Sequence, residues 1–339
     1  MMRAFEMGPQ DGLASLRSAN RPIPEPAANE LLLKVHAACL NHRDLLALKG
    51  QYGAIKPEDR VPLSDGVGTI VGMGNAVSGF SEGQRIVAPH FVSWIDGLYS
   101  PAIFAQDLGI SRNGWLAEYI TIPADAAIVV PDNVNTESAA TLAAAATTAW
   151  HCMVSFGGLK PSDLVLAPGT GGVSIVTLQL AKAMGAQVAI TSSSDEKLET
   201  CRAIGADFTV NYCSHSDWPK ALLEATGGRA ADIVVDTVGL ASIEQTIDAS
   251  APNGRIALIG GLAGMMDKAP NMSGILGKNL TLKGITSGSR AMMQEMLNLV
   301  AEKGIEPLVD SRFASDDAPA AYAHLASGNH MGKVMITFT

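Results

Sequence analysis

The spacing of apolar residues along the chain changes character at about Ala139. Up to about Ile122, short apolar runs such as 31–37, 68–73 and 85–89 are separated by Gly, Pro and Asn, which is typical of strands. From Ala139 onward, apolar runs of strand length alternate with segments of helical spacing. The pattern predicts a β-rich domain first, and then βαβ units on a parallel sheet.

The alternating half resolves into a series of expected elements. An alanine-rich helix is expected over 139–156, another over 314–326, and a last strand over 332–338. Before the alternating half, residues 89–115 show no regular pattern, which predicts a long surface loop. Long loops in compact domains are often functional. The expected central strands cover 164–167, 187–191, 207–210, 232–236 and 255–259, and the helices cover 175–184, 195–204 and 218–225.

A glycine-rich turn follows the first strand of the alternating half. Gly169 permits a tight turn, and Gly171 and Gly172 let the backbone approach a pyrophosphate where a Cβ would intrude. Ser174 stands where the strict pattern has a third glycine. Because a strand, a helix and a second strand surround the turn, we interpret it as a dinucleotide site rather than a structural turn. The residues expected at the phosphates are Gly169, Thr170, Gly171, Gly172 and Val173.

The end of the next strand indicates which dinucleotide is bound. An NAD site usually places a carboxylate there for the ribose hydroxyls. This chain offers Ser192 and Ser193 instead, with Lys197 one helical turn beyond. Hydroxyls and an ammonium suit a 2′-phosphate, so we expect NADP as the cofactor. Asp195 is expected to cap the following helix.

Charge and composition exclude several classes of protein. With 24 basic and 33 acidic residues the net charge is −9, and no basic block stands out, so nucleic acid and anionic membrane are not expected partners. The chain contains no run of about 18 apolar residues, so no membrane span is expected. The N-terminus has no apolar signal-peptide core. The scattered cysteines predict reduced thiols in a cytoplasmic protein. They are Cys39, Cys152, Cys201 and Cys213.

Several motifs together resemble one family over the full length of the chain. They are Asn41-His42-Arg43-Asp44, 62–68, 114–119, 147–150, the glycine turn, 192–197 and 235–239. With them the chain resembles the medium-chain dehydrogenase/reductase superfamily, and most closely its zinc-free quinone oxidoreductase and alcohol-dehydrogenase-like branch. The resemblance implies an α/β fold, with a GroES-like catalytic domain over 1–123 and 288–339 wrapped around a Rossmann NADP-binding domain over 124–287. It also implies a homodimer.

The resemblance further implies a departure from the zinc-dependent members. Those members have a cysteine where this chain has Asn41, a His-Glu pair at Ser64-Asp65, and a third ligand at Ala144. A tetrahedral zinc needs three such ligands and an open site, and here Asp65 alone could serve. The four cysteines of their structural-zinc lobe are also missing from 88–115. We therefore expect no zinc.

Another group must then polarise the substrate oxygen. Tyr52 matches a tyrosine of related enoyl and quinone reductases, and a phenol can donate a hydrogen bond or a proton to a carbonyl or enolate oxygen. Asn41 offers an amide donor, and His42 is a third candidate as an acid. Each has a structural alternative: Tyr52 as a surface aromatic, Asn41 as a turn residue, and His42 as a packed or solvated side chain.

Other cofactor contacts are implied by position within the family. Thr148 matches a threonine that faces the nicotinamide, and Lys197 with Tyr212 matches a pair that flanks the 2′-phosphate. Ser289 is expected to close the nicotinamide side. The residues expected near the nicotinamide ribose, at the ends of successive strands, are Val238, Gly239, Ile259 and Gly260.

The function that follows is a zinc-independent NADP(H) oxidoreductase. It would pass a hydride to a small molecule activated by a carbonyl, such as an enone or a quinone. The alternative is interconversion of secondary alcohols and ketones, and a further alternative is a non-catalytic nucleotide-binding protein with a structural or sensing role. Trp94, Tyr99 and Phe104 are expected either to shape an apolar substrate pocket or to form a dimer contact.

Overall fold

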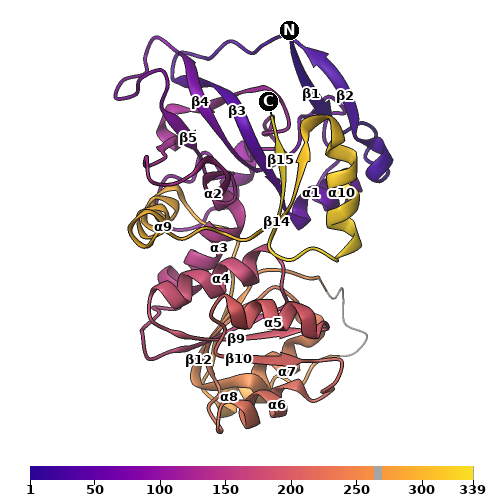
Figure 1. The fold of residues 1–339 in the computed structure, drawn as a ribbon, viewed down its shortest axis with the longest axis vertical. Helices are drawn as coiled ribbons and strands as arrows, with labels where there is room; N and C mark the ends of the chain where they lie inside the picture. The colour runs from indigo at the N-terminus through magenta and orange to yellow at the C-terminus, as the bar shows by residue number, and fades with distance from the viewer. Residues whose placement is uncertain (263–268, 339) are drawn as a thin grey trace. The chain divides into compact units, whose positions relative to one another are not determined.

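The computed structural model describes residues 1–262 and 269–338, and it divides the chain into two compact units (Figure 1). Unit 1 comprises Met1–Thr147 and Gly288–Thr339, and unit 2 comprises Thr148–Ser287. Residues 124–147, which we expected in the Rossmann domain, group with unit 1 instead. The reason is packing, because the helix α2 (Thr136–Ala140) contacts two strands of the unit 1 sheet.

Unit 2 is built on a parallel sheet that has six strands within the described residues, in the order β10-β9-β8-β11-β12-β13. This is the doubly wound order 3-2-1-4-5-6 of a Rossmann fold, so the expected fold class is confirmed. The strands are β8 (Leu164–Pro168), β9 (Gln187–Ser192), β10 (Phe208–Asn211), β11 (Ala231–Asp236), β12 (Ser250–Leu258) and β13 (Thr281–Gly284). The helices are α4 (Gly172–Ala183), α5 (Asp195–Ala203), α6 (Trp218–Ala225), α7 (Ile243–Ala249) and α8 (Ser273–Gly277).

Burial explains which strands of unit 2 the sequence reveals. Every residue of the central strand β8 is buried, and its sequence Leu-Val-Leu-Ala-Pro is an uninterrupted apolar run. The edge strand β13 is largely exposed, and its sequence Thr-Leu-Lys-Gly carries no apolar run. We therefore predicted β8 and missed β13.

Unit 1 contains a sheet in the order β14-β15-β3-β4-β5-β7, with β6 paired to β3, and a separate hairpin of β1 and β2. The C-terminal strand β15 lies between β14 and β3, so the end of the chain completes the N-terminal sheet, as we expected. The strands are β1 (Met2–Glu6), β2 (Arg17–Arg21), β3 (Glu30–Leu40), β4 (Asp65–Met73), β5 (Arg85–Val87), β6 (Tyr119–Pro123), β7 (Ile128–Val129), β14 (Val309–Ala314) and β15 (Lys333–Thr337).

Helices of unit 1 pack against this sheet, and α2 does so on β3 and β4. The helix α10 (Ala318–Ser327) packs beside β14 and β15 (Figure 1). The other helices of unit 1 are α1 (His42–Leu48), α2 and α9 (Arg290–Lys303). The helix that we expected over 139–156 is interrupted by π-helical turns at Leu142–Ala146 and His151–Phe156, on either side of α3 (Thr147–Trp150). Turns of that kind are frequent near functional sites.

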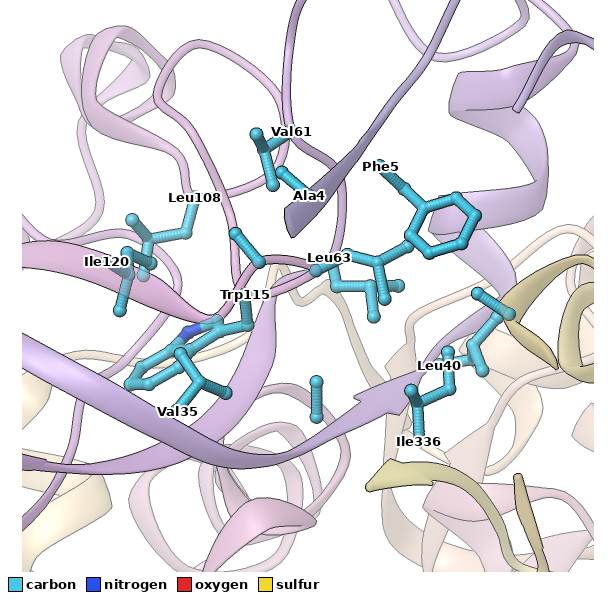
Figure 2. Packing of buried hydrophobic residues seen from close by; sticks show 14 of the residues in the cluster. Ala4, Phe5, Val35, Leu40, Val61, Leu63, Leu108, Trp115, Ile120 and Ile336 are labelled. Atoms are coloured by element: carbon cyan, nitrogen blue, oxygen red, sulfur yellow. The ribbon is translucent and has the colours of Figure 1, made fainter. Parts of the chain in front are cut away.

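The core of unit 1 includes Trp115, which is fully buried. Figure 2 shows its indole beside Val35 of β3, with Leu63 close by and Ile120 of β6 on the other side. This cluster holds the segment that ends at Ser64 and leads into β4, which begins with Asp65.

No helix in the part of the chain that the structure describes is long and apolar enough to span a membrane. The four cysteines are all free, and Cys213 is the exposed one.

Candidate functional site

The glycine turn of unit 2 has the geometry of a phosphate cradle. Gly169 has φ +85°, a backbone conformation that favours glycine. Gly171 is the N-cap of α4, and a Cβ placed on it would point into open space with no atom within 4 Å. That open space lies at a helix N-terminus, where unpaired backbone N–H groups favour an anion. The residues fit the pyrophosphate of a dinucleotide.

Ser174 explains why the third position of the turn is not glycine. It is buried in the first turn of α4, and its Oγ donates to the carbonyl oxygen of Pro168 at 2.7 Å. The Thr237 hydroxyl donates to the same oxygen at 3.2 Å. The serine therefore ties the helix to the end of β8 with a hydrogen bond that a glycine lacks.

The residues expected at the 2′-phosphate come together at the carboxyl ends of β9 and β10. Ser192 is buried and pairs in register with Asn211, and the Tyr212 amide donates to the Ser192 carbonyl at 3.0 Å. Ser193 is exposed, and Tyr212 is 43% exposed. Lys197 lies in the first turn of α5.

One local expectation at this edge is wrong. The N-cap of α5 is Ser194, whose Oγ accepts from the Lys197 amide at 3.3 Å, and Asp195 is the first residue of the helix. The Asp195 carboxylate accepts from the Asn211 side chain at 2.8 Å instead. The serine run offered several capping hydroxyls, and the structure uses the one immediately before the helix.

The residues expected near the nicotinamide ribose also lie together. The carboxylate of Asp236 accepts from the amides of Val238 and Gly239, each at 2.9 Å. The Ile259 amide donates to the Asp236 carbonyl at 2.9 Å, which brings the end of β12 beside the end of β11. A Cβ on Gly260 would lie 2.4 Å from the Thr237 carbonyl oxygen, so only glycine fits this approach. Sequence reasoning missed the part that Asp236 plays.

Thr148 and Ser289 lie on different units. Thr148 is buried on α3, at the start of unit 2. Ser289 is buried in unit 1, where its Oγ accepts from the Met292 amide at 3.3 Å and caps α9. The roles of both at the nicotinamide stay predictions.

In unit 1, Asn41 is the N-cap of α1 and belongs to a buried polar cluster. Its Nδ2 donates to Ser64 Oγ at 3.1 Å, and its Oδ1 accepts from Lys333 Nζ at 2.6 Å. The Lys333 ammonium also bonds Asp65 Oδ2 at 3.0 Å, and Asp65 Oδ1 accepts from the Ala144 amide at 2.9 Å. Hydrogen bonds thus link the four positions that match zinc-site residues of relatives. Lys333, which the sequence did not indicate, bonds two of them.

This donor set does not fit a zinc ion. Zinc takes thiolate, imidazole and carboxylate ligands, and Asn41, Ser64 and Ala144 supply none of these. The carboxylate of Asp65 is paired with an ammonium whose side chain is 4% exposed. A divalent cation at that place would meet the positive charge of Lys333. Within 1–262 and 269–338, moreover, no group of three or more His, Cys, Asp or Glu side chains could hold a metal ion.

The backbone before Ser64 is strained. Leu63 has φ +78°, a conformation that costs a non-glycine residue about 1 kcal/mol or more. Its carbonyl accepts from the Trp115 amide at 3.0 Å, and Gly109 and Gly114 pack against its backbone so closely that a Cβ on either would clash. The surrounding core therefore fixes the direction in which the chain enters the cluster.

Tyr52 lies in the loop after α1 and is half-buried. The hydrogen bond that Tyr52 makes within the described residues is through its backbone carbonyl, so its hydroxyl is available to a ligand. Burial raises the pKa of the phenol, while the guanidinium of Arg43, 4.9 Å from the ring centroid, acts in the opposite direction. His42 is exposed at the first position of α1.

Arg43 belongs to an ionic group that the sequence did not reveal. Its Nη2 donates to Asp107 Oδ2 at 2.6 Å, and the other oxygen of Asp107 lies 2.9 Å from His90 Nδ1. Asp107 and His90 belong to the long loop, 64 and 47 residues from Arg43. The position of Arg43 inside a family motif was the available signal, but no spacing rule names its partners.

The aromatic residues of the long loop divide between the interior and the surface. Trp94 is buried in a small cluster with Phe91 and Ile103. Tyr99 and Phe104 are 48% and 38% exposed. A surface cavity of about 600 Å³ in unit 1 is lined by other segments, among them 21–25 and 119–121, and by none of the expected site residues.

Comparison with known families matches both units. Residues 27–132 match the family described as alcohol dehydrogenase GroES-like domain, and residues 172–302 match the family described as zinc-binding dehydrogenase. A zinc-type alcohol dehydrogenase-like protein of Schizosaccharomyces pombe is 38% identical over 336 residues, which cover 96% of each chain. An acryloyl-coenzyme A reductase of Sulfurisphaera tokodaii is 27% identical, over 93% of this chain and 94% of its own.

Solved structures agree with the fold. A structure described as an NAD-dependent alcohol dehydrogenase has a TM-score of 0.90 and 33% identity, over 99% of both chains. A mycobacterial protein solved in complex with NADPH has a TM-score of 0.82 and 26% identity, over 99% of this chain and 100% of its own. The chain belongs to the medium-chain dehydrogenase/reductase superfamily, as an oxidoreductase of the alcohol-dehydrogenase-like type.

Proposed function

We propose that this protein is a zinc-independent NADP(H) oxidoreductase that reduces a carbon–carbon double bond conjugated to a carbonyl, as in an enone or a quinone. The observation that carries the proposal is the pairing of Lys333 with Asp65 and Asn41, at distances of 3.0 and 2.6 Å. The Lys333 ammonium bonds the two side chains at positions where zinc-dependent relatives are expected to carry metal ligands. The substrate oxygen must therefore be polarised by hydrogen-bond donors.

Tyr52 is the donor that we assign to the substrate oxygen. NADPH, when bound, supplies a hydride from its nicotinamide ring. Negative charge then develops on the carbonyl oxygen of the substrate, and the free hydroxyl of Tyr52 stabilises that charge by donating a hydrogen bond or a proton. The side-chain amide of Asn41 has a second N–H besides the one that bonds Ser64, and we assign this N–H as a second hydrogen-bond donor to the substrate oxygen. His42, which is exposed, remains a third candidate.

The residues of unit 2 support binding of a dinucleotide. The amides from Gly171 onward, at the start of α4, would hold the pyrophosphate, and the ends of β11 and β12 would hold the nicotinamide ribose. We propose NADP rather than NAD because Ser192, Ser193 and Lys197 gather where a 2′-phosphate would lie. The mycobacterial neighbour bound to NADPH supports this assignment, and the NAD-dependent neighbour makes NADH the necessary comparison.

The second candidate is a zinc-free alcohol dehydrogenase that interconverts secondary alcohols and ketones. The structural neighbour described as an alcohol dehydrogenase, at 33% identity, favours it. The relative described as an acryloyl-coenzyme A reductase, at 27% identity, favours the double-bond reaction. The same hydroxyl of Tyr52 would serve either reaction, because both place negative charge on an oxygen.

A substrate panel separates the two candidates. Consumption of NADPH is followed with quinones, enones and ketones, and the products are identified by mass spectrometry. We expect turnover of enones or quinones with retention of the carbonyl group. Turnover of ketones alone would favour the alcohol dehydrogenase. Tight binding of NADPH without turnover of any compound would instead indicate a non-catalytic nucleotide-binding protein.

The role of Tyr52 is tested by Tyr52→Phe, with Tyr119→Phe as the matched control. Loss of a hydrogen-bond donor to a developing oxyanion costs about 100-fold or more in turnover, so we expect that loss for Tyr52→Phe and wild-type activity for Tyr119→Phe. Equal activity of both variants would remove Tyr52 from the mechanism.

The metal content is tested on the purified protein by elemental analysis. We expect zinc far below one atom per chain, and turnover that survives dialysis against a chelator. Stoichiometric zinc, lost together with activity on dialysis, would contradict the proposal.

The cofactor preference is tested by Lys197→Ala, with the exposed Lys220→Ala as its control. Loss of a charged contact to the 2′-phosphate weakens NADPH binding by about tenfold, while NADH binding should not change. Fluorescence titration of the nucleotide measures both affinities without turnover. Equal losses for NADPH and NADH would assign Lys197 a different role.

We also propose that the protein is a cytoplasmic homodimer. Among the residues that the structure describes, the strand β13 is the edge of the unit 2 sheet, and an unpaired strand edge favours pairing with another chain. Leu276, just before it, is 87% exposed, and Met272 is 37% exposed. Light scattering during size-exclusion chromatography should give the mass of two chains, and Leu276→Asp should shift it toward one. A monomeric wild-type protein would contradict the dimer.

A further inference from the structure

We propose that Arg43 is a positioning residue for Tyr52: its guanidinium holds the ring in place and stabilises the phenolate that forms when Tyr52 gives up its proton. This inference rests on the proposed function, because Arg43 gains this role only if Tyr52 acts on the substrate oxygen. It extends that function by naming the residue that makes a half-buried phenol able to serve as an acid.

The contact between the two side chains is direct. The Cζ atom of Arg43 lies 4.9 Å from the centroid of the Tyr52 ring and 5.9 Å from that of Phe91. A guanidinium within about 6 Å of an aromatic centroid is attracted to the ring. Within the residues that the structure describes, Tyr52 forms its hydrogen bond through the backbone carbonyl, so the ring is held while the hydroxyl stays free.

Two residues of the long loop hold Arg43 in this position. Asp107, which is fully buried, accepts from Arg43 Nη2 at 2.6 Å, and the Arg43 side chain is only 10% exposed. His90 Nδ1 lies 2.9 Å from the second oxygen of Asp107 and also contacts Arg43 Nη1. A charged side chain with so little exposure cannot turn to solvent without breaking this ion pair. The ion pair therefore favours the position of the guanidinium beside the ring.

The charges around Tyr52 act in opposite directions. Burial raises the pKa of the phenol, and Asp107 and Asp44 raise it further, whereas Arg43 lowers it. His90 stays neutral near pH 7, because burial and the charge of Arg43 lower its pKa. The Lys56 ammonium donates to the carbonyl oxygen of Tyr52, away from the phenol. The charged and titratable groups around the ring are Arg43 and Asp44 of α1, His90 and Asp107 of the long loop, and Lys56.

The proton transfer that Arg43 assists can be written in full. After the hydride reaches the β-carbon of an enone, the carbonyl oxygen carries the negative charge. The O–H bond of Tyr52 breaks, its proton forms a new O–H bond on that oxygen, and the product leaves as the enol, which converts to the ketone. Water then returns a proton to the phenolate. The positive charge of Arg43 stabilises the enzyme in the interval when Tyr52 is ionised.

The experiment compares Asp107→Asn with the double variant Arg43→Gln/Asp107→Asn. The double variant leaves no unpaired charge in the buried site, so it avoids the main cause of misfolding. Tyrosinate absorbance is titrated in each protein and in its Tyr52→Phe version, and the difference isolates Tyr52. We expect the Tyr52 pKa to fall in Asp107→Asn and to rise by about one unit on adding Arg43→Gln, a tenfold change in the ionisation constant. Turnover should fall about tenfold between the same two variants.

The opposite signs separate an electrostatic role from a structural one, since general damage to the site would move both variants in the same direction. If Tyr52→Phe abolishes turnover but Arg43→Gln leaves the Tyr52 pKa unchanged, the role of Arg43 is overturned and the proposed function stands. If Tyr52→Phe keeps full activity, the proposed function of Tyr52 fails and this inference fails with it.

Discussion

Lys333 carries a positive charge where its side chain is only 4% exposed. It bonds Asp65 and Asn41, and Asp65 in turn receives the Ala144 amide, so one ammonium closes a cluster drawn from four parts of the chain. Asn41 and Lys333 are 292 residues apart. The family resemblance predicts that positions 41, 64 and 144 lack zinc ligands, but no spacing pattern could show that Lys333 bonds Asn41 and Asp65 there.

At the scale of a single residue, Lys333→Met should be strongly destabilising. It leaves the fully buried carboxylate of Asp65 without its partner charge, a change that costs about 3–5 kcal/mol. The unfolding free energy is measured by urea denaturation. The control is Lys333→Met/Asp65→Asn, in which the amide oxygen can still accept from Ala144 and no charge is stranded. We expect the double variant to recover most of the loss, and equal stability of the two variants would contradict a charge effect.

At the scale of elements, the β8–turn–α4 unit follows closely from its sequence. The buried apolar run, the glycines and the helical spacing all lie where the pattern placed them, because each depends on residues that are close in sequence.

The long loop, by contrast, depends on residues that are distant in sequence. It is ordered by Asp107 bonding Arg43, and by the amides of Arg290 and Ala291 donating to its carbonyls, at 2.8 and 2.9 Å. Such partners are distant in sequence, so the pattern predicted only a loop.

Ser174 provides the prediction for this unit. Ser174→Ala removes a buried 2.7 Å hydrogen bond between α4 and the end of β8, and such a loss costs about 1 kcal/mol. The matched control is Thr177→Val on the same helix, where the buried Thr177 hydroxyl has no partner among the described residues. We expect Thr177→Val to be neutral or stabilising in a thermal melt. Equal losses for the two variants would mean that the Ser174 hydrogen bond contributes nothing specific.

At the scale of the whole molecule, the sequence was most informative about the order of elements. The doubly wound sheet of unit 2 and the return of the C-terminal strand to the sheet of unit 1 both follow the predicted plan. The missed elements, such as β13 and β14, are edge strands with exposed or alternating residues, so their sequences lack the uniform apolar run of a buried strand. The boundary at 124–147 depended on packing between α2 and the unit 1 sheet, which is a tertiary effect.

Buried titratable groups in both units predict how the stability of the molecule depends on pH. Burial lowers the pKa of His36, His90 and His151, so near pH 6 the unfolded chain binds more protons than the folded one. Stability should therefore fall as the pH is lowered from about 7 to about 5, with each group contributing at most about 1.4 kcal/mol per pH unit. Asp44 opposes this trend, because burial raises its pKa to about 7 and the folded state binds its proton first.

The two opposing contributions can be separated with two variants. His90→Asn removes one group that favours unfolding in acid, so its unfolding free energy should fall less steeply with decreasing pH than that of the wild type. Asp44→Asn removes one of the carboxyl groups that favour folding in acid, so its curve should fall more steeply. Urea denaturation at several pH values between about 5 and 8 measures both slopes. A wild-type stability that rises steadily on acidification would show that the buried carboxyl groups outweigh the histidines.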